Sequence, residues 1–100
     1  MAKFSIFTED EITTFLESHS DWSIKDGKLT AIFTFKTFID AIAVVNEVAT
    51  ESERVNHHPE WCNTYNKLSF SFCTHDAGNK ITNLDIEMAK FISIVAKKYI

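Results

Sequence analysis

The most informative part of the sequence is residues 26–53, which read DGKLTAIFTFKTFIDAIAVVNEVATESE and change halfway from one periodicity to another. In residues 28–36 apolar and polar side chains alternate, which predicts a β-strand with one face on a core. After Thr37, a typical N-cap residue, the spacing becomes helical. The apolar residues at this spacing are Phe38, Ala41, Ile42, Val45, Val48 and Ala49. We therefore expect a strand followed by a long helix that reaches about residue 53.

Two hairpins are predicted around this strand and helix. Asp26-Gly27 is a hairpin turn that would pair the first strand with a short one at residues 22–24. Residues 67–73 also alternate, with Leu68, Phe70 and Phe72 on one face. Tyr65-Asn66 precedes them, so residues 61–64 are the expected partner strand.

Two further helices are expected near the ends of the chain. Thr8 and Glu11 form a capping box ahead of a short helix at residues 8–19. Thr82 begins a third helix at residues 82–99, whose polar positions form only a narrow stripe. A helix this apolar has more than one partner, and in a chain of 100 residues the second partner can be another subunit.

The resulting order is α-ββ-α-ββ-α, which predicts the α+β class. We expect a four-stranded antiparallel sheet with the helices packed on one face. The length and the absence of any linker predict a single domain over residues 1–100.

Composition narrows the functional classes. The sequence is 45% hydrophobic and contains nine Phe, which predicts a packed core rather than disorder. Its formal net charge of -4 argues against direct nucleic-acid binding. No apolar run approaches the ~20 residues that span a membrane, and the first residues do not resemble a secretory signal. The two cysteines, Cys62 and Cys73, form no CxxC pair, which favours a reduced, cytoplasmic protein.

Three of the four histidines flank the second hairpin. His57 and His58 follow the long helix, with Pro59 directly after them, and His75 follows the strand at residues 67–73. The hairpin would make these two segments neighbours, and imidazoles with a pKa near ~6.5 suit proton transfer at neutral pH. Two alternatives remain open. The pair could simply end the helix, or three histidines and a water could bind zinc, although adjacent side chains tend to diverge.

Other residues near the histidines have both a structural and a functional interpretation. Glu53 lies four residues before His57 and could fix its tautomer, or it could be a solvated acid at the helix end. Asp85 could support the site or only cap the third helix. Trp61 could stack on a flat aromatic ligand or pack in the core.

These motifs together are similar to the pterin-4a-carbinolamine dehydratase family. The matching segments are ERVNHHPEW at 53–61, THDAG at 74–78, then Thr82 and Asp85, and the similarity extends over nearly the whole chain. The sequence departs from the commonest family pattern at residues 79–81, Asn-Lys-Ile, which lengthen the interval between His75 and Asp85 by about one residue. Asn79 can adopt the left-handed conformation that glycine usually supplies in such a turn.

The resemblance implies dehydration of a 4a-hydroxytetrahydropterin to the quinonoid dihydropterin, a step in tetrahydrobiopterin regeneration, with no metal or organic cofactor. It implies that His57 and His75 exchange protons with the substrate and that His58 mainly binds and orients it. The implied supporting residues are Glu53, which would orient His57, and Asp85. The implied substrate-binding residues are Pro59, Trp61, Thr74, Asp76 and Ala77.

The resemblance also implies partners. Relatives form dimers and tetramers, so we expect a homodimer or homotetramer that uses the apolar helix at residues 82–99. Some relatives act as dimerisation or assembly cofactors of other proteins. A non-catalytic role of that kind, with a protein partner, is the alternative function. The presence of all three histidines of the motif favours the enzyme.

Overall fold

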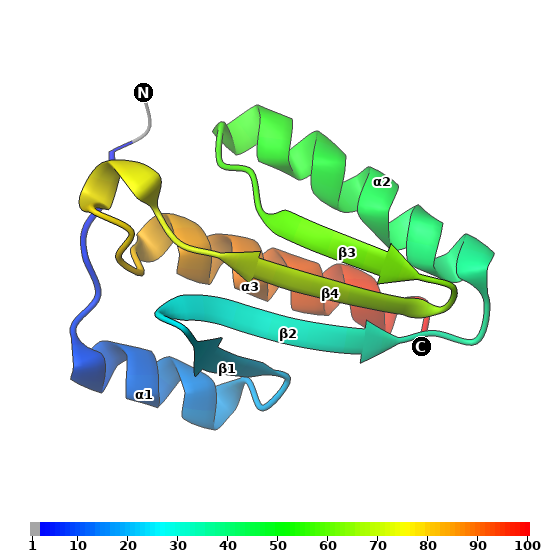
Figure 1. Cartoon of the computed structure of the whole chain (residues 1–100), viewed down its shortest axis with the longest axis horizontal. Coiled ribbons are helices and arrows are strands. Elements are labelled where there is room, and N and C mark those ends of the chain that lie inside the picture. The colour runs from blue at the N-terminus through cyan, green and yellow to red at the C-terminus, as the bar shows by residue number, and fades with distance from the viewer. Residues whose placement is uncertain (1–2) are drawn as a thin grey trace.

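The computed structural model describes residues 3–100 and has the expected order of elements (Figure 1). The elements are α1 (Glu9–Ser18), β1 (Trp22–Lys25), β2 (Lys28–Thr34), α2 (Phe38–Val55), β3 (Glu60–Thr64), β4 (Lys67–Phe72), the 3-10 helix η1 (His75–Ala77) and α3 (Asn83–Lys97). The observed bounds differ from the predicted ones by at most two residues. The helix α3 ends at Lys97 and is followed by a short turn.

The four strands form one antiparallel sheet in the order β1-β2-β4-β3. In the central pair Leu29 lies opposite Phe72 and Phe33 lies opposite Leu68, so the two apolar rows lie on the same face. The Asp26-Gly27 turn between β1 and β2 has positive φ at both residues, as a type I′ hairpin turn requires. Local turn chemistry and alternation therefore set the register together.

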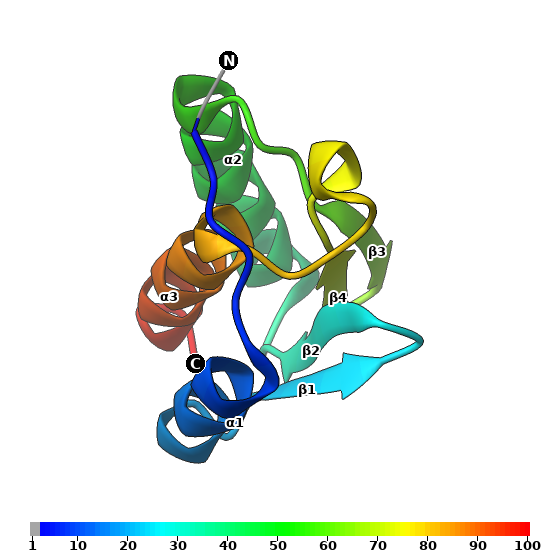
Figure 2. The same ribbon diagram turned by 90° about the vertical axis from the view of Figure 1, so that its left-hand side faces the viewer.

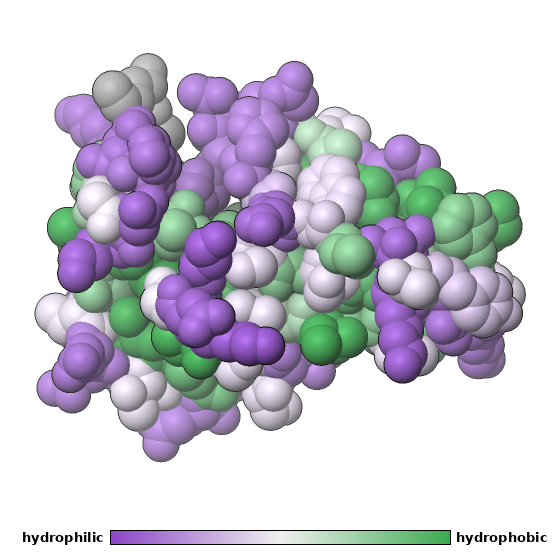
Figure 3. All heavy atoms as spheres, in the orientation of Figure 1, coloured by the Kyte–Doolittle hydropathy of each residue, from purple (hydrophilic) through white to green (hydrophobic). Residues whose placement is uncertain are grey.

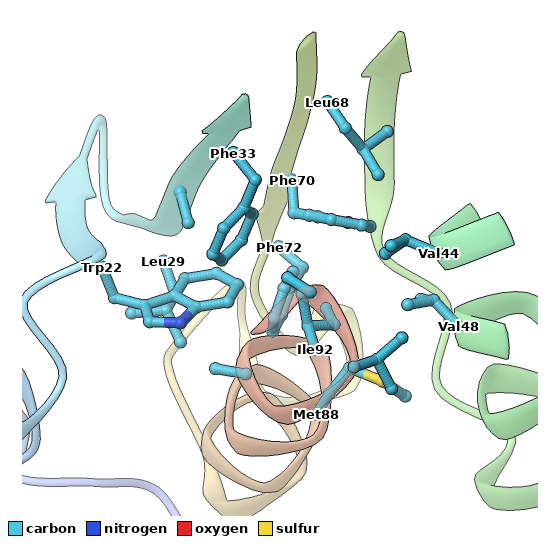
Figure 4. Close-up of a cluster of buried hydrophobic side chains, with 14 of the residues drawn as sticks. Trp22, Leu29, Phe33, Val44, Val48, Leu68, Phe70, Phe72, Met88 and Ile92 are labelled. Carbon is cyan, nitrogen blue, oxygen red and sulfur yellow. The ribbon is translucent and has the colours of Figure 1, made fainter. Parts of the chain in front are cut away.

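All three helices cover this apolar face of the sheet, as Figure 2 shows. The core between the layers combines the two central strands with the inner faces of α2 and α3 (Figure 4). Phe70, Leu29, Leu68, Ile92, Val44 and Val48 are its largest fully buried apolar side chains. The predicted α+β class, with its helices on one face, is confirmed.

The other face of the sheet carries mostly polar residues and remains open. Figure 3 views this side and shows hydrophilic and hydrophobic residues mixed over it. Lys28, Thr30 and Thr34 of β2 point to this side, and Ile32 is its most exposed large apolar residue at 66%. Among residues 3–100, no helix has the length and hydrophobicity needed to cross a membrane.

Most of the apolar surface of α3 is accounted for within the chain. Ile86, Met88, Ala89, Ile92, Val95 and Ala96 are buried against the rest of the fold. Ile94, at 67% exposure, is the large apolar residue of α3 that stays on the surface. The expected association with a second subunit stays a prediction.

A short N-terminal segment is tied to the start of α3, which the sequence did not indicate. Ile6 forms an isolated antiparallel bridge with Thr82, and the Phe7 N–H donates to the Ile81 carbonyl at 2.9 Å. The Ser5 N–H donates to Asn83 Oδ1 at 2.7 Å. These bonds fix residues 5–7 beside the N-terminus of α3.

Candidate active site

Four segments meet at one end of the molecule, where α2 ends and α3 begins. Figure 1 shows the end of α2, η1, the start of α3 and the N-terminal segment gathered there. Between them lies a pocket of about 130 Å³. Its lining residues are Phe4, Asn56, His57, Thr74, His75, Asp76 and Leu84. The prediction that the segments near His57 and His75 are neighbours is therefore confirmed.

The end of α2 places His57 at this pocket. Asn56 has φ of +54° and caps the helix in the left-handed conformation, which asparagine tolerates better than most residues. The His57 N–H then donates to the Ser52 carbonyl at 3.1 Å. The chain therefore leaves the helix after Asn56, and the His57 side chain turns toward α3.

The His57 ring is held by a fully buried carboxylate. Its Nε2 lies 2.7 Å from Asp85 Oδ1, and the side chains of His57 and Asp85 are 10% and 0% exposed. The second oxygen, Oδ2, accepts from the Thr82 N–H and from the Thr74 hydroxyl, each at 2.9 Å. Asp85 therefore caps α3 with one oxygen and holds the histidine with the other, so both interpretations of this residue apply together.

The directions of these hydrogen bonds follow from the donors available. Thr74 donates its proton to Asp85, so Thr82, whose hydroxyl lies 2.6 Å away, must donate to Thr74. Thr82 Oγ1 in turn accepts from the Leu84 N–H at 3.2 Å. The Thr82 N–H and the Thr74 hydroxyl both donate to Asp85, so we assign its third partner, the neutral His57 ring, as a further donor with its proton on Nε2.

The other ring nitrogen of His57, Nδ1, is consequently unprotonated and free. Among residues 3–100 every buried side-chain nitrogen or oxygen has a hydrogen-bond partner, and no partner of Nδ1 is present there. Nδ1 must therefore be accessible to solvent. An imidazole with a free basic nitrogen at a pocket and a carboxylate behind it has the arrangement of a general base.

His75 lies on η1 at the opposite side of the pocket and is exposed. Its Nδ1 is 3.3 Å from Asn79 Oδ1. The neighbouring Cys73 Sγ lies 4.0 Å from the same oxygen. Burial and then the negative charge of Asp85 raise the pKa of the Cys73 thiol, which makes it a poor nucleophile at neutral pH.

The predicted pairing of Glu53 with His57 is wrong. Glu53 Oε2 lies 2.8 Å from Nε2 of His58 instead, and this pair is largely exposed. The physical reason is the end of α2 at Val55, because the spacing of four residues brings side chains together only while the helix continues. Asp85 takes the role that was expected of Glu53.

The predicted substrate-binding residues divide into two groups. Thr74 and Asp76 line the pocket, although the Thr74 hydroxyl is already engaged by Asp85 and Thr82. Pro59, Trp61, Ala77 and His58 are not among its lining residues. Trp61 packs edge-on against Phe70, with ring centroids 6.2 Å apart, and is 38% exposed.

Three lining residues were not foreseen. Phe4 reaches the pocket because the N-terminal segment pairs beside α3, and this pairing leaves no local pattern in the sequence. Asn56 could have been recognised as a left-handed helix cap. Leu84 could have been placed there once Thr82 was accepted as the N-cap.

Within the described residues, 3–100, no group of three or more His, Cys, Asp or Glu side chains is arranged to hold a metal ion.

Comparisons with known proteins point to one family. Residues 5–95 match the family model described as "Pterin 4 alpha carbinolamine dehydratase". The chain is 41% identical to a protein of Sulfurisphaera tokodaii over 85% of this chain and 90% of that one, and 39% identical to one of Solibacter usitatus over 89% and 93%. Both carry the name "Putative pterin-4-alpha-carbinolamine dehydratase".

A solved structure shows the same fold. The crystal structure named "transcriptional coactivator/pterin dehydratase" from Brucella melitensis superposes with a TM-score of 0.86 at 34% identity. The similarity covers 92% of this chain and 99% of that one.

Proposed function

Because the chain belongs to the pterin-4-alpha-carbinolamine dehydratase family, we propose that it dehydrates a 4a-hydroxytetrahydropterin to the quinonoid dihydropterin. It is thus a lyase. The observation that carries the proposal is the pocket with two imidazoles on its wall, one of them backed by a buried carboxylate.

The reaction requires two proton transfers and no change of oxidation state. A base removes the proton from ring nitrogen N5, and the electron pair of that N–H bond forms the C4a=N5 double bond. The C4a–O bond breaks as an acid protonates the departing hydroxyl, which leaves as water. Solvent then returns the base and the acid to their starting states. Because the protein only has to take up one proton and supply another, the proposal includes no metal or organic cofactor.

We assign His57 as the base and His75 as the acid. His57 presents a free Nδ1, and the Asp85 carboxylate stabilises the imidazolium that forms when it accepts a proton. The hydrogen-bond partner of His75 is a neutral amide, which gives its imidazolium less stabilisation than a carboxylate would. We therefore give the role of acid to His75, whose partner does not hold the proton by charge.

The remaining pocket residues suit a flat, polar ring system. Phe4 offers an aromatic side chain at the pocket wall, and it is 37% exposed. Asp76 can accept hydrogen bonds from the amino and ring N–H donors of a pterin. His58, held by Glu53 outside the pocket lining, would contact parts of the substrate that extend from it. Thr74 serves as a positioning residue for Asp85 rather than as a substrate ligand.

The proposal extends to cellular context and association. We propose that the reaction belongs to the regeneration of tetrahydropterins, because its product would be a quinonoid dihydropterin. Cys62 and Cys73 are free thiols, which supports a reducing, cytoplasmic environment.

We expect a homodimer or homotetramer whose contact includes Ile94 and the adjoining, half-buried Phe91. A monomer at micromolar concentration in light scattering would contradict this expectation.

Single histidine replacements test the proposal. His57→Ala and His75→Ala should each lower kcat for dehydration by about 10²- to 10⁴-fold, the usual contribution of a positioned base or acid. His19→Ala is the matched control, because His19 stacks on Phe15 and bonds its carbonyl, outside the pocket. Full turnover by His75→Ala would refute the assignment. Failure of the wild type to exceed the spontaneous rate would leave the assembly role as the better explanation.

A further inference from the structure

The loop that follows β4 holds an asparagine against the second site histidine. The loop closes on itself through two backbone bonds, from the Thr74 N–H to the Lys80 carbonyl at 2.9 Å and from the Asn79 N–H to the Thr74 carbonyl at 3.0 Å. Asn79 adopts φ of +63°, a left-handed conformation that asparagine tolerates. The backbone thus fixes Asn79 across the loop from His75.

The oxygen of the Asn79 side chain then lies near two side chains that can donate a hydrogen bond. Its Oδ1 lies 3.3 Å from His75 Nδ1 and 4.0 Å from Cys73 Sγ. Burial raises the pKa of the Cys73 thiol, so this group keeps its proton at neutral pH and can donate it. A carbonyl oxygen has two lone pairs and can accept from both groups, whereas the amide NH₂ would find a weak acceptor in sulfur.

We propose that Asn79 is a positioning residue for His75 that keeps the proton on Nδ1. Its Oδ1 accepts the Nδ1–H bond in both the charged and the neutral ring. Nε2 is then the nitrogen that exchanges its proton with the substrate. This inference rests on the proposed acid role of His75. It adds the reason why Nε2, rather than Nδ1, exchanges a proton with the substrate.

Two variants separate the side chain of Asn79 from its backbone conformation. Asn79→Gly keeps the positive φ at no steric cost but removes the amide oxygen. Asn79→Asp keeps an acceptor oxygen and also tolerates the left-handed conformation. Asp26→Gly is the matched control, because Asp26 also has a positive φ of 54° but lies in the turn between β1 and β2, away from the pocket.

The first readout is the tautomer of His75, obtained from the ¹⁵N chemical shifts of its ring nitrogens in the full chain without substrate, at a pH where the ring is neutral. We expect protonated Nδ1 and unprotonated Nε2 in the wild type, a mixture of tautomers in Asn79→Gly, and the wild-type pattern in Asn79→Asp and Asp26→Gly. Unchanged ring shifts in Asn79→Gly, or a mixture in Asn79→Asp, would overturn the inference.

The second readout is turnover. Loss of one exposed hydrogen bond should lower kcat of Asn79→Gly by about two- to tenfold, with KM nearly unchanged and Asp26→Gly equal to the wild type. A reduced kcat with unchanged ring shifts would also contradict the inference. The tautomer is measured without substrate, so a wild type that lacks dehydratase activity would remove the proposed function without deciding the role of Asn79.

Discussion

Replacing Asp85 by asparagine should reverse the proton arrangement on His57 while preserving the shape of the site. The carboxylate accepts three hydrogen bonds, from His57, Thr74 and the Thr82 N–H. In Asp85→Asn the amide oxygen can still accept from Thr74 and from the Thr82 N–H. The amide NH₂ then faces His57 and must donate to Nε2. His57 would therefore carry its proton on Nδ1, where the base needs a free lone pair.

The expected effect on turnover is large and that on stability is moderate. Loss of the correct tautomer should lower kcat by about 10²- to 10⁴-fold. Hydrogen bonds to a charged acceptor are worth about 1 kcal/mol more than those to a neutral one, and two such bonds are weakened. Relief of the buried charge offsets part of this loss, so we expect a net destabilisation of about 1–2 kcal/mol. In a chain of this size that lowers Tm by roughly 4–16 °C.

The assay compares kcat and Tm of the wild type, Asp85→Asn and Asp21→Asn. Asp21 is an exposed acid just before β1 and serves as the control for loss of one negative charge. Both kcat and Tm of Asp21→Asn should match the wild type. A folded Asp85→Asn protein with wild-type kcat would refute the assignment of His57 as a base oriented by this carboxylate.

Three other expectations concern the fold away from the pocket. Trp22→Phe removes the buried bond from Nε1 to Ser93 Oγ at 2.8 Å and should lower the free energy of unfolding by about 1–3 kcal/mol in urea titrations. Iodoacetamide should alkylate exposed Cys62 well before Cys73, whose thiol pKa is raised by burial, and mass spectrometry showing equal rates would contradict this. Hydrogen bonds from Lys98 and Tyr99 lower the pKa of Glu47 below its ordinary 4.5. The ionised Glu47 therefore stabilises the fold above that pH, and this contribution is lost as the pH falls through the folded-state pKa. Glu47→Gln should accordingly reduce the pH dependence of Tm in acid.

Local patterns in the sequence were sufficient to predict the architecture. Alternation in residues 28–36 and 67–73 placed one apolar row on each central strand, and Asp26-Gly27 set the first hairpin. Each of these signals acts over a few residues, so each could be interpreted without knowing the rest of the fold. The neighbouring positions of His57 and His75 followed from the second hairpin in the same way.

The contacts inside the site depended on details that such patterns do not resolve. Because α2 ends at Val55, the helical spacing of four residues does not bring Glu53 beside His57. Glu53 contacts His58 instead, and His57 contacts Asp85. Phe4 arrives through long-range pairing, for which the sequence has no local signature. A sequence does not show that the two oxygens of Asp85 have separate partners, so it is compatible with capping and with support of the site.

The rate of dehydration by the wild-type chain is the measurement on which the proposed function depends. Freshly generated 4a-hydroxytetrahydropterin would be mixed with the protein, and the ultraviolet change on dehydration would be followed against buffer alone and against the double variant His57→Ala, His75→Ala. We predict acceleration that grows in proportion to wild-type concentration and is lost in the double variant. A wild-type rate equal to the spontaneous rate, or equal acceleration by the double variant, would contradict the histidine mechanism.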